Sequence, residues 1–166
     1  MIQAVIFDLD GTLIDLPVDY EKLFSETRKI TKMENIRPLA DTVLRLSART
    51  RRKVLKAWDG TELDALAKMT INDEGTRIYK KFSAKRKALV TMQGKALVTV
   101  ALERLRLSFE VVLTREDSLS RVEQLKNAAQ KLGTQADDVL FVGNTEGDQL
   151  AAEKVGCQFL KVKMNR

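Results

Sequence analysis

The chain has 166 residues, which is enough for one folded core and a small second lobe. It contains no histidine and one cysteine, which excludes Ser-His-Asp and Cys-His catalysis, histidine-ligated zinc sites and an internal disulfide. The net charge is +6 and uneven: residues 17–87 contain 18 Lys and Arg against 10 Asp and Glu, whereas the rest of the chain contains 11 and 13. The sequence therefore indicates a basic insert within a mildly acidic frame, in which any catalysis depends on carboxylates, hydroxyls and cations.

Two features bear on where the protein works. No apolar run approaches the ~20 residues that cross a bilayer, and the N-terminal residues lack the basic start and cleavable apolar stretch of a signal peptide. The single cysteine, Cys157, fits a reducing compartment. We therefore expect a cytoplasmic protein that does not associate with a membrane.

The acidic frame alternates predicted strands with predicted helices. Apolar runs typical of buried parallel strands occupy residues 4–7, 88–90, 109–113, 139–142 and 159–162. Helical spacing follows Gly94, follows the capping pair Ser120 and Glu123, and ends at Gly133 and Gly156. Strands that alternate with helices predict an α/β fold with a Rossmann-like parallel sheet.

The insert shows helical spacing and no strand-like alternation. Four helices are expected there, placed at residues 20–27, from Pro38 to about 57, from Thr61 or Asp64, and from a cap at Asn72. The sequence thus predicts two parts. Residues 1–16 and 83–166 form the core, and residues 17–82 form a helical cap.

Polar residues follow three of the predicted strands. They are Asp8, Thr91 and, after Gly143, Asn144. In open parallel sheets, ligands bind beyond the carboxyl ends of the strands. We therefore expect these side chains to meet at one edge of the sheet.

The strongest chemical signal is the segment Asp8-Leu9-Asp10-Gly11-Thr12. Two carboxylates that follow a strand two residues apart can converge where the chain turns, and Gly11 permits that turn. Asp8 can attack phosphorus and form an aspartyl-phosphate, while Asp10 can protonate the leaving oxygen and later activate water. Both carboxylates need a hard divalent cation, and Mg²⁺ with oxygen ligands suits them. The alternative is a solvated Asp-rich turn, which the apolar surroundings disfavour.

Residues 6–15, Ile-Phe-Asp-Leu-Asp-Gly-Thr-Leu-Ile-Asp, resemble the first motif of the haloacid dehalogenase-like (HAD) superfamily. The resemblance extends over residues 1–16 and about 85–162, and the insert stands where that family has a small cap. It implies that Asp8 is the nucleophile and Asp10 the general acid and base. The second aspartate marks the family's phosphatases, so the resemblance argues against dehalogenation.

Two further motifs of the family imply phosphate-binding residues. Thr91 matches the strand-end Ser or Thr of the second motif, whose hydroxyl, with the amide of Met92, would hold a phosphoryl oxygen. The third motif is a lysine near a helix start, often followed by proline, and this chain has no such Lys-Pro. Arg121 is the best match in position and would neutralise phosphate and Asp8, with Lys126 in reserve. The alternatives are an ordinary polar strand end and a surface arginine.

The fourth motif usually supplies an aspartate that binds the metal directly, followed by a second Asp four residues on. Here Asn144 stands at the first position and Asp148 at the second. An amide oxygen can bind Mg²⁺ but carries no charge, which Glu146 or Asp148 would have to supply. The resemblance implies Mg²⁺ held by Asp8, the backbone carbonyl of Asp10, and Asn144 or Asp148. The alternative for Asp148 is a helix N-terminal carboxylate stabilised by the dipole.

The expected function is Mg²⁺-dependent hydrolysis of a small phosphate monoester, and the expected partner is a small phosphorylated metabolite. Phosphoglycolate is one candidate by analogy. Asn144 leaves open a catalytically weakened module that binds a phosphorylated ligand or partner. The basic run at residues 49–53, with Trp58 nearby, leaves open nucleic-acid binding through the cap. Basic helix faces are common, so nucleic-acid binding is the less favoured alternative.

Overall fold

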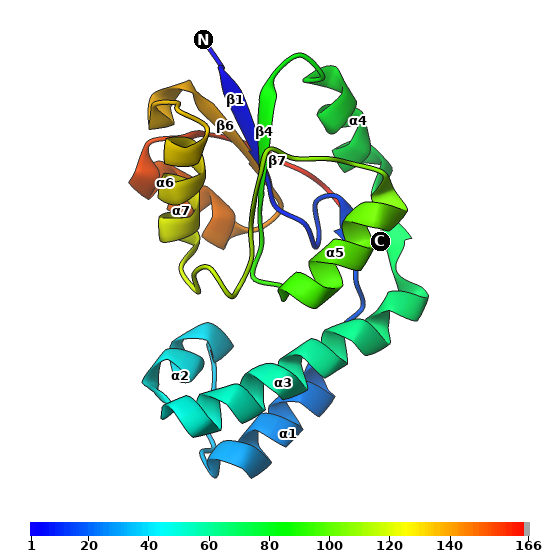
Figure 1. Cartoon of the computed structure of the whole chain (residues 1–166), viewed down its shortest axis with the longest axis vertical. Helices are drawn as coiled ribbons and strands as arrows, with labels where there is room; N and C mark the ends of the chain where they lie inside the picture. Colours follow the sequence, from blue (N-terminus) through cyan, green and yellow to red (C-terminus); the bar gives the residue numbers. More distant parts are fainter. Residues whose placement is uncertain (165–166) are drawn as a thin grey trace.

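A five-stranded parallel sheet lies at the centre of the computed structural model, which describes residues 1–164 (Figure 1). The strand order is β5-β4-β1-β6-β7. The strands are β1 (Ala4–Phe7), β4 (Arg86–Val90), β5 (Val111–Leu113), β6 (Val139–Gly143) and β7 (Gln158–Lys161). The predicted α/β fold with a Rossmann-like parallel sheet is confirmed, with small shifts at the strand ends.

The central strand β1 explains why the sheet is covered on both faces. All its residues are fully buried, and it pairs with β4 on one side and β6 on the other. Apolar side chains alternate between the two faces of a strand, so a strand that is apolar throughout requires packing on both. Because the carboxyl ends of β1, β4 and β6 lie side by side, the polar residues that follow them reach the same edge of the sheet.

Helices form a layer on each face of the sheet (Figure 1). On one face α5 (Lys95–Leu105) and α4 (Asp73–Lys81) pack against Val5 and Phe7. On the other face α6 (Arg121–Lys131) and α7 (Glu146–Val155) pack against Ile6 and Phe141. Ser120 caps α6 and Gly156 ends α7, as the sequence predicted. The φ angle of Gly156 is 92°.

The cap consists of α1 (Tyr20–Thr31), α2 (Leu39–Arg45) and α3 (Ala48–Ala65), which lie below the sheet in Figure 1. These helices share a small apolar core of their own, formed by Leu23, Leu39, Val43, Val54 and Trp58. The helical character predicted for the insert is therefore found, although the boundaries of its helices differ.

Two predicted helix boundaries in the cap are wrong. The helix expected from Pro38 to about residue 57 is interrupted, because Ser47 accepts a hydrogen bond from the Thr50 amide and starts a new helix. No helix starts at Thr61, which lies inside α3. Its hydroxyl donates to the carbonyl of Ala57 within the same helix, at 2.8 Å, and so does not cap a helix start.

Helix α4 packs on the core, although the expected cap extended to residue 82. Asn72 caps this helix as predicted, by accepting from the Glu74 amide. The Tyr79 ring lies 5.8 Å from the Phe7 ring, and a Cβ at Gly75 would collide with the backbone carbonyl of Thr12. The bundle of cap helices therefore ends with α3, because the apolar face of α4 is needed to cover the sheet.

Two short strands connect the cap to the core. β2 (Ile14–Asp15) and β3 (Thr70–Ile71) form an antiparallel pair. The insert therefore contains a strand, β3, although it was expected to be wholly helical. A two-residue strand carries too few residues to show alternation in the sequence.

None of the helices within residues 1–164 has the length and apolarity needed to cross a membrane.

Candidate active site

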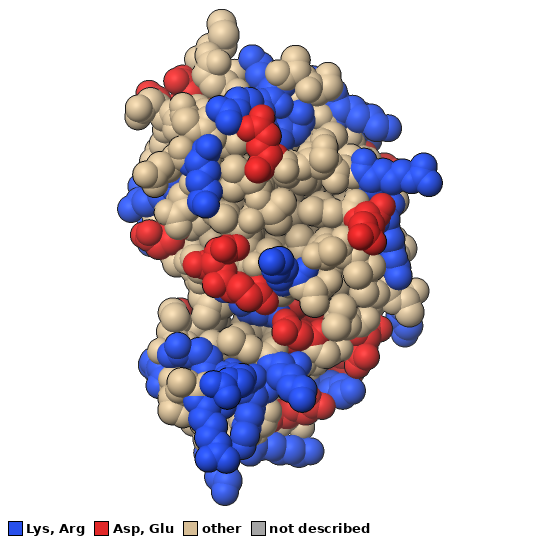
Figure 2. All heavy atoms as spheres, in the orientation of Figure 1, with Lys and Arg blue, Asp and Glu red and all other residues tan. Residues whose placement is uncertain are grey.

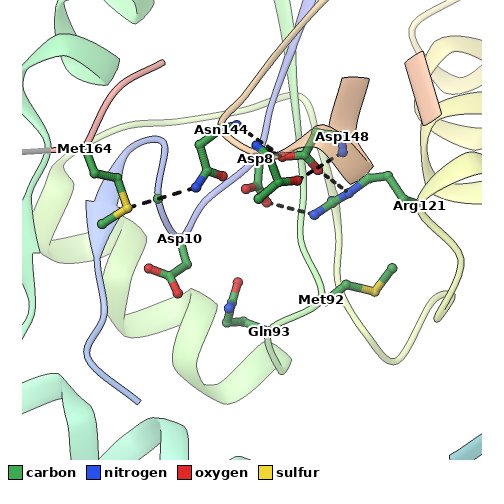
Figure 3. Close-up of a pocket in the computed structure, with 10 residues that line it drawn as sticks. Asp8, Asp10, Met92, Gln93, Arg121, Asn144, Asp148 and Met164 are labelled. Atoms are coloured by element: carbon green, nitrogen blue, oxygen red, sulfur yellow. Dashed lines mark hydrogen bonds and ion pairs between the residues drawn. The ribbon is translucent and has the colours of Figure 1, made fainter. Parts of the chain in front are cut away.

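A cavity of about 290 Å³ opens at the carboxyl ends of β1, β4 and β6 (Figure 3). It is lined by Asp8, Asp10, Gly11, Met92, Gln93, Arg121, Asn144, Thr145, Asp148 and Met164. Six of the seven predicted site residues, all except Thr91, are in this set. The expectation that polar strand ends meet at one edge of the sheet is therefore met for Asp8 and Asn144.

Asp8 is a buried carboxylate of the cavity, with an exposed fraction of 5%. Its backbone amide donates to the Val142 carbonyl at 3.0 Å, which fixes it at the end of β1. Burial raises the pKa of the Asp8 carboxyl to about 7, and the nearby charges of Asp148 and Asp10 add to the rise while Arg121 opposes it. Asp8 therefore needs more positive charge than Arg121 supplies to stay fully ionised at neutral pH.

Arg121 is the cationic side chain of the cavity. Its Nη2 donates to Asp8 Oδ1 at 3.0 Å, and its Nε lies 3.2 Å from Asp148 Oδ1. Its Nη1 donates to Gln124, whose side-chain amide is itself held by three backbone carbonyls of the core. Lys126 is 56% exposed and pairs with Glu123. Of the two candidates for the cationic role, only Arg121 reaches the cavity.

Asp10 enters the cavity from the turn that follows β1. Gly11 has φ 85°, a conformation that favours glycine, and this turn brings Asp10 back beside Asp8. The Leu16 amide donates to Asp10 Oδ1 at 2.9 Å and orients the carboxylate. The two carboxylates therefore converge on one cavity, as the Asp-x-Asp-Gly spacing predicted.

Asn144 has an oxygen suited to a cation. Its Oδ1 is buried and has no hydrogen-bond partner, although buried polar atoms normally have one. A Cβ at Gly11 would lie 2.8 Å from this oxygen, so the glycine also leaves room for the amide. Within residues 1–164, no three side chains of His, Cys, Asp or Glu are grouped to hold a metal ion. A cation here would use the Asp8 carboxylate, the Asn144 amide oxygen and a backbone carbonyl, a donor set that fits Mg²⁺.

Asp148 is held by protein donors at both carboxylate oxygens. Oδ2 accepts from the amides of Asn144 and Thr145, at 3.1 and 3.2 Å, and Oδ1 contacts Arg121. It also forms the capping box of α7 with Thr145. Metal binding by Asp148 stays a prediction, whereas its role in orienting Asn144 and Arg121 is direct. Glu146 is exposed and does not line the cavity.

Thr91 is fully buried behind the cavity wall. Its hydroxyl donates to the Gln93 side chain and accepts from the Gln93 amide at 3.1 Å. This hydroxyl therefore does not line the cavity, where Met92 and Gln93 form the wall (Figure 3), and its contact with phosphate stays a prediction. Sequence reasoning missed Gln93, although a polar residue close after a strand end is the signal that identified Thr91.

The comparisons with known proteins agree with this geometry. The sequence model of the haloacid dehalogenase-like hydrolase family matches residues 5–162. No protein with a curated function matches the sequence.

Three solved structures illustrate the likeness in fold. A haloacid dehalogenase-like family hydrolase from Streptococcus pneumoniae has a TM-score of 0.71 and 18% identity over 96% of this chain and 84% of its own. A candidate phosphoglycolate phosphatase from Lactobacillus plantarum has a TM-score of 0.70 and 19% identity over 96% and 86%. A HAD family enzyme from Bacteroides thetaiotaomicron, in a magnesium complex, has a TM-score of 0.64 and 16% identity over 99% and 95%.

These structural likenesses describe the fold, because all three identities are low. The family match covers nearly the whole chain, including Asp8, which follows β1, and the helix that carries Asp148. The chain belongs to the haloacid dehalogenase-like hydrolase family.

Proposed function

We propose that the protein is a Mg²⁺-dependent phosphohydrolase that cleaves a small phosphate monoester through an aspartyl-phosphate on Asp8. The observation that carries the proposal is the contact between Arg121 and Asp8 in a cavity that Asp10 also lines. A nucleophilic carboxylate, a second carboxylate and a fixed cation are the groups that phosphoryl transfer to a protein side chain requires.

The chain's own residues divide the reaction between them. Asp8 Oδ attacks phosphorus, and the bond from phosphorus to the ester oxygen breaks as Asp10 donates a proton to that oxygen. Asp10 then takes a proton from water, which attacks the phosphorus and releases phosphate from Asp8. Arg121, which also contacts Asp148, binds the phosphoryl oxygens. Its positive charge lowers the electrostatic cost of bringing an anion to Asp8.

The unpaired oxygen of Asn144 supports the metal dependence of the proposal. Mg²⁺, when bound, would supply the positive charge that keeps Asp8 ionised and shields the phosphate. The residues proposed to hold it are Asp8, Asn144 and the backbone carbonyl of Asp10. The Bacteroides thetaiotaomicron relative was solved as a magnesium complex, which is consistent with this assignment.

The volume of the cavity limits the substrate class. About 290 Å³ lies at the lower end of the volumes of small-molecule sites, so a small phosphorylated metabolite is the proposed partner. The candidate phosphoglycolate phosphatase among the relatives makes short phosphorylated acids the first compounds to test.

Asn144 favours a second candidate, a module that binds a phosphorylated ligand with little turnover. A neutral amide at this position binds a divalent cation less strongly than a carboxylate does.

The nucleic-acid alternative receives less support. Figure 2 shows Lys and Arg side chains gathered over the cap, and Arg49, Arg52 and Lys53 are exposed there. Trp58, however, is buried and cannot stack on bases.

Hydrolysis of p-nitrophenyl phosphate and a panel of small phosphorylated acids, with Mg²⁺ and with EDTA, tests the proposal. We expect turnover that needs Mg²⁺ and that is lost in Asp8→Asn, since a neutral amide of the same shape is a poor nucleophile. Phosphate binding without turnover would favour the binding module, and turnover by a folded Asp8→Asn variant would exclude the mechanism.

A further inference from the structure

Arg115, which follows β5 in the core, reaches into the junction between the core and the cap. Its Nη1 and Nη2 donate to the two carboxylate oxygens of Glu62 on α3, at 3.0 and 2.9 Å. Nη2 also contacts Asp59, and the guanidinium lies 4.1 Å from the centroid of the Trp58 ring. The side chains of Arg115 and Glu62 are 2% and 1% exposed. A buried, bidentate ion pair therefore joins the cap to the core.

The same two residues hold the backbone of residues 92–94, which we call the 92–94 loop. Arg115 Nη1 donates to the Met92 carbonyl at 3.0 Å, and the Arg115 amide donates to the Gln93 carbonyl at 3.1 Å. Glu62 Oε1 accepts from the Gly94 amide at 2.9 Å. Because Met92 and Gln93 line the cavity, the ion pair at the cap junction also fixes the shape of the cavity wall.

Gly94 is required for this close approach. A Cβ at this position would lie 2.6 Å from Arg115 Nη2 and would collide with Asp59 Oδ1. Gly94 is also the N-cap residue of α5 and has no side chain to accept a hydrogen bond at the start of that helix. Glu62, from the cap, supplies an acceptor there. At the start of this core helix, the cap therefore binds the amide of Gly94, and Glu116 of the core binds that of Lys95.

We propose that Arg115 and Glu62 form a latch, which sets the geometry of the 92–94 loop when the cap is seated on the core. Lifting the cap would leave the Gly94 amide unpaired and Arg115 without its carboxylate partners, so a seated cap and an ordered loop are stabilised together. The two residues act as positioning residues, through Met92 and Gln93. The role of the 92–94 loop as a wall that holds phosphate rests on the proposed function.

The test uses the whole chain and two changes to the latch. Glu62→Gln keeps the shape but replaces one acceptor oxygen with a donor that faces the donors of Arg115 or Gly94. The double variant Glu62→Met with Arg115→Met removes both buried charges together, a change that cores generally tolerate, so it provides a folded protein if the single variant is unstable. Glu110→Gln is the matched control, since it breaks the exposed Arg86–Glu110 pair within the core.

Two measurements report on the latch. Amide hydrogen exchange at Gly94, followed by NMR, reads the loop directly, and calorimetry with inorganic phosphate and Mg²⁺ reads its effect on the cavity. We expect both latch variants to exchange Gly94 about tenfold faster and to bind phosphate about tenfold more weakly, while Glu110→Gln matches the parent protein.

The outcomes separate the latch from the proposed function. Unchanged exchange at Gly94 in a folded latch variant overturns the latch. Faster exchange with unchanged phosphate affinity limits the pair to a structural role and overturns its positioning role. If the parent protein itself neither hydrolyses phosphate esters nor binds phosphate, the proposed function fails, and the exchange at Gly94 alone decides whether the cap orders the loop.

Discussion

Two arginines of this protein each lie between two carboxylates, yet Arg115 is buried whereas Arg121 is only partly buried. Arg115 contacts Glu62 and Asp59 at the cap junction, and its Nη1 also donates to a backbone carbonyl. Arg121 contacts Asp8 and Asp148 in the cavity, which stays accessible to small molecules.

The difference shows what marks a reactive site in this fold. Burial raises the pKa of both Asp8 and Glu62, so a raised pKa alone does not tell them apart. The distinction lies in hydrogen bonds that are left unmade. The Asn144 oxygen beside Asp8 has no partner, whereas both oxygens of Glu62 are occupied. Substitutions in the two clusters should therefore have different effects, because one cluster is unsatisfied and the other is satisfied.

Loss of the second carboxylate should act on rate alone. We expect Asp10→Asn to slow hydrolysis by roughly two to four decades while phosphate binding is kept, because general acid–base help is of that size. Steady-state kinetics together with calorimetric phosphate binding checks this. Near-normal turnover would assign the acid role to another group, and its pH profile would identify that group's ionisation.

Loss of Arg115 alone should act on stability. Arg115→Met leaves Glu62 buried without its cation, and we expect a loss of about 3–5 kcal/mol in the free energy of unfolding. Urea denaturation of this variant beside Glu110→Gln measures the effect. A loss no larger than that of the exposed control would mean that water enters the cap junction and solvates Glu62.

Much of the fold could be predicted because its signals are local. The apolar run before Asp8 predicts a strand, and the Ser120 cap and the Gly156 stop predict helix ends. The break before α3 was missed because helical spacing continues across Ser47. The packing of α4 on the sheet was missed because it depends on contacts with Phe7, far away in the sequence.

The residues of the site likewise divide into those that local sequence signals predict and those that they do not. Asp8, Asp10 and Asn144 follow strands, so chain order alone placed them at the cavity. Thr91 follows a strand too, yet its side chain turns away to Gln93, and a spacing pattern carries no information about that rotamer. The pair of Arg115 and Glu62 was invisible to sequence reasoning, because the two residues are 53 positions apart and neither belongs to a motif.

The raised pKa of Asp8 predicts a pH dependence of stability. With a pKa of about 7 in the folded protein against 3.8 for an ordinary Asp, Asp8 binds more protons in the folded state between pH 4 and 7. Its contribution to stability is therefore complete below pH 4 and is lost as the pH rises through 7.

Comparison of the metal-free protein with Asp8→Asn isolates this contribution. One pKa unit is worth about 1.4 kcal/mol, so the stability of Asp8→Asn relative to the parent should rise by about 2–3 kcal/mol from pH 5 to pH 8. Urea denaturation in EDTA at both values measures it, and Mg²⁺ should diminish the difference. Arg86 lowers the pKa of Glu110 from its ordinary value of 4.5, so that pair can change the stability only below pH 4.5, and Glu110→Gln should show no such rise between pH 5 and pH 8. A difference that stays constant with pH would mean that Asp8 is ionised throughout.

The smallest expected effect comes from restoring a charge to the unsatisfied cluster. Asn144→Asp has nearly the same shape, so it fits beside Gly11, and its carboxylate attracts a cation more strongly than the amide does even after desolvation. We expect about tenfold tighter Mg²⁺ binding, seen as a lower metal concentration for half-maximal activity. Turnover need not rise, since a more negative cavity also repels the phosphate dianion.

Both oxygens of Asp148 are already held by protein donors, which leaves position 144 free to take the metal. Glu146→Gln, outside the cavity, is the control and should leave the metal titration unchanged. Flat or weaker Mg²⁺ affinity in Asn144→Asp would show that the orphaned oxygen of Asn144 does not bind the metal.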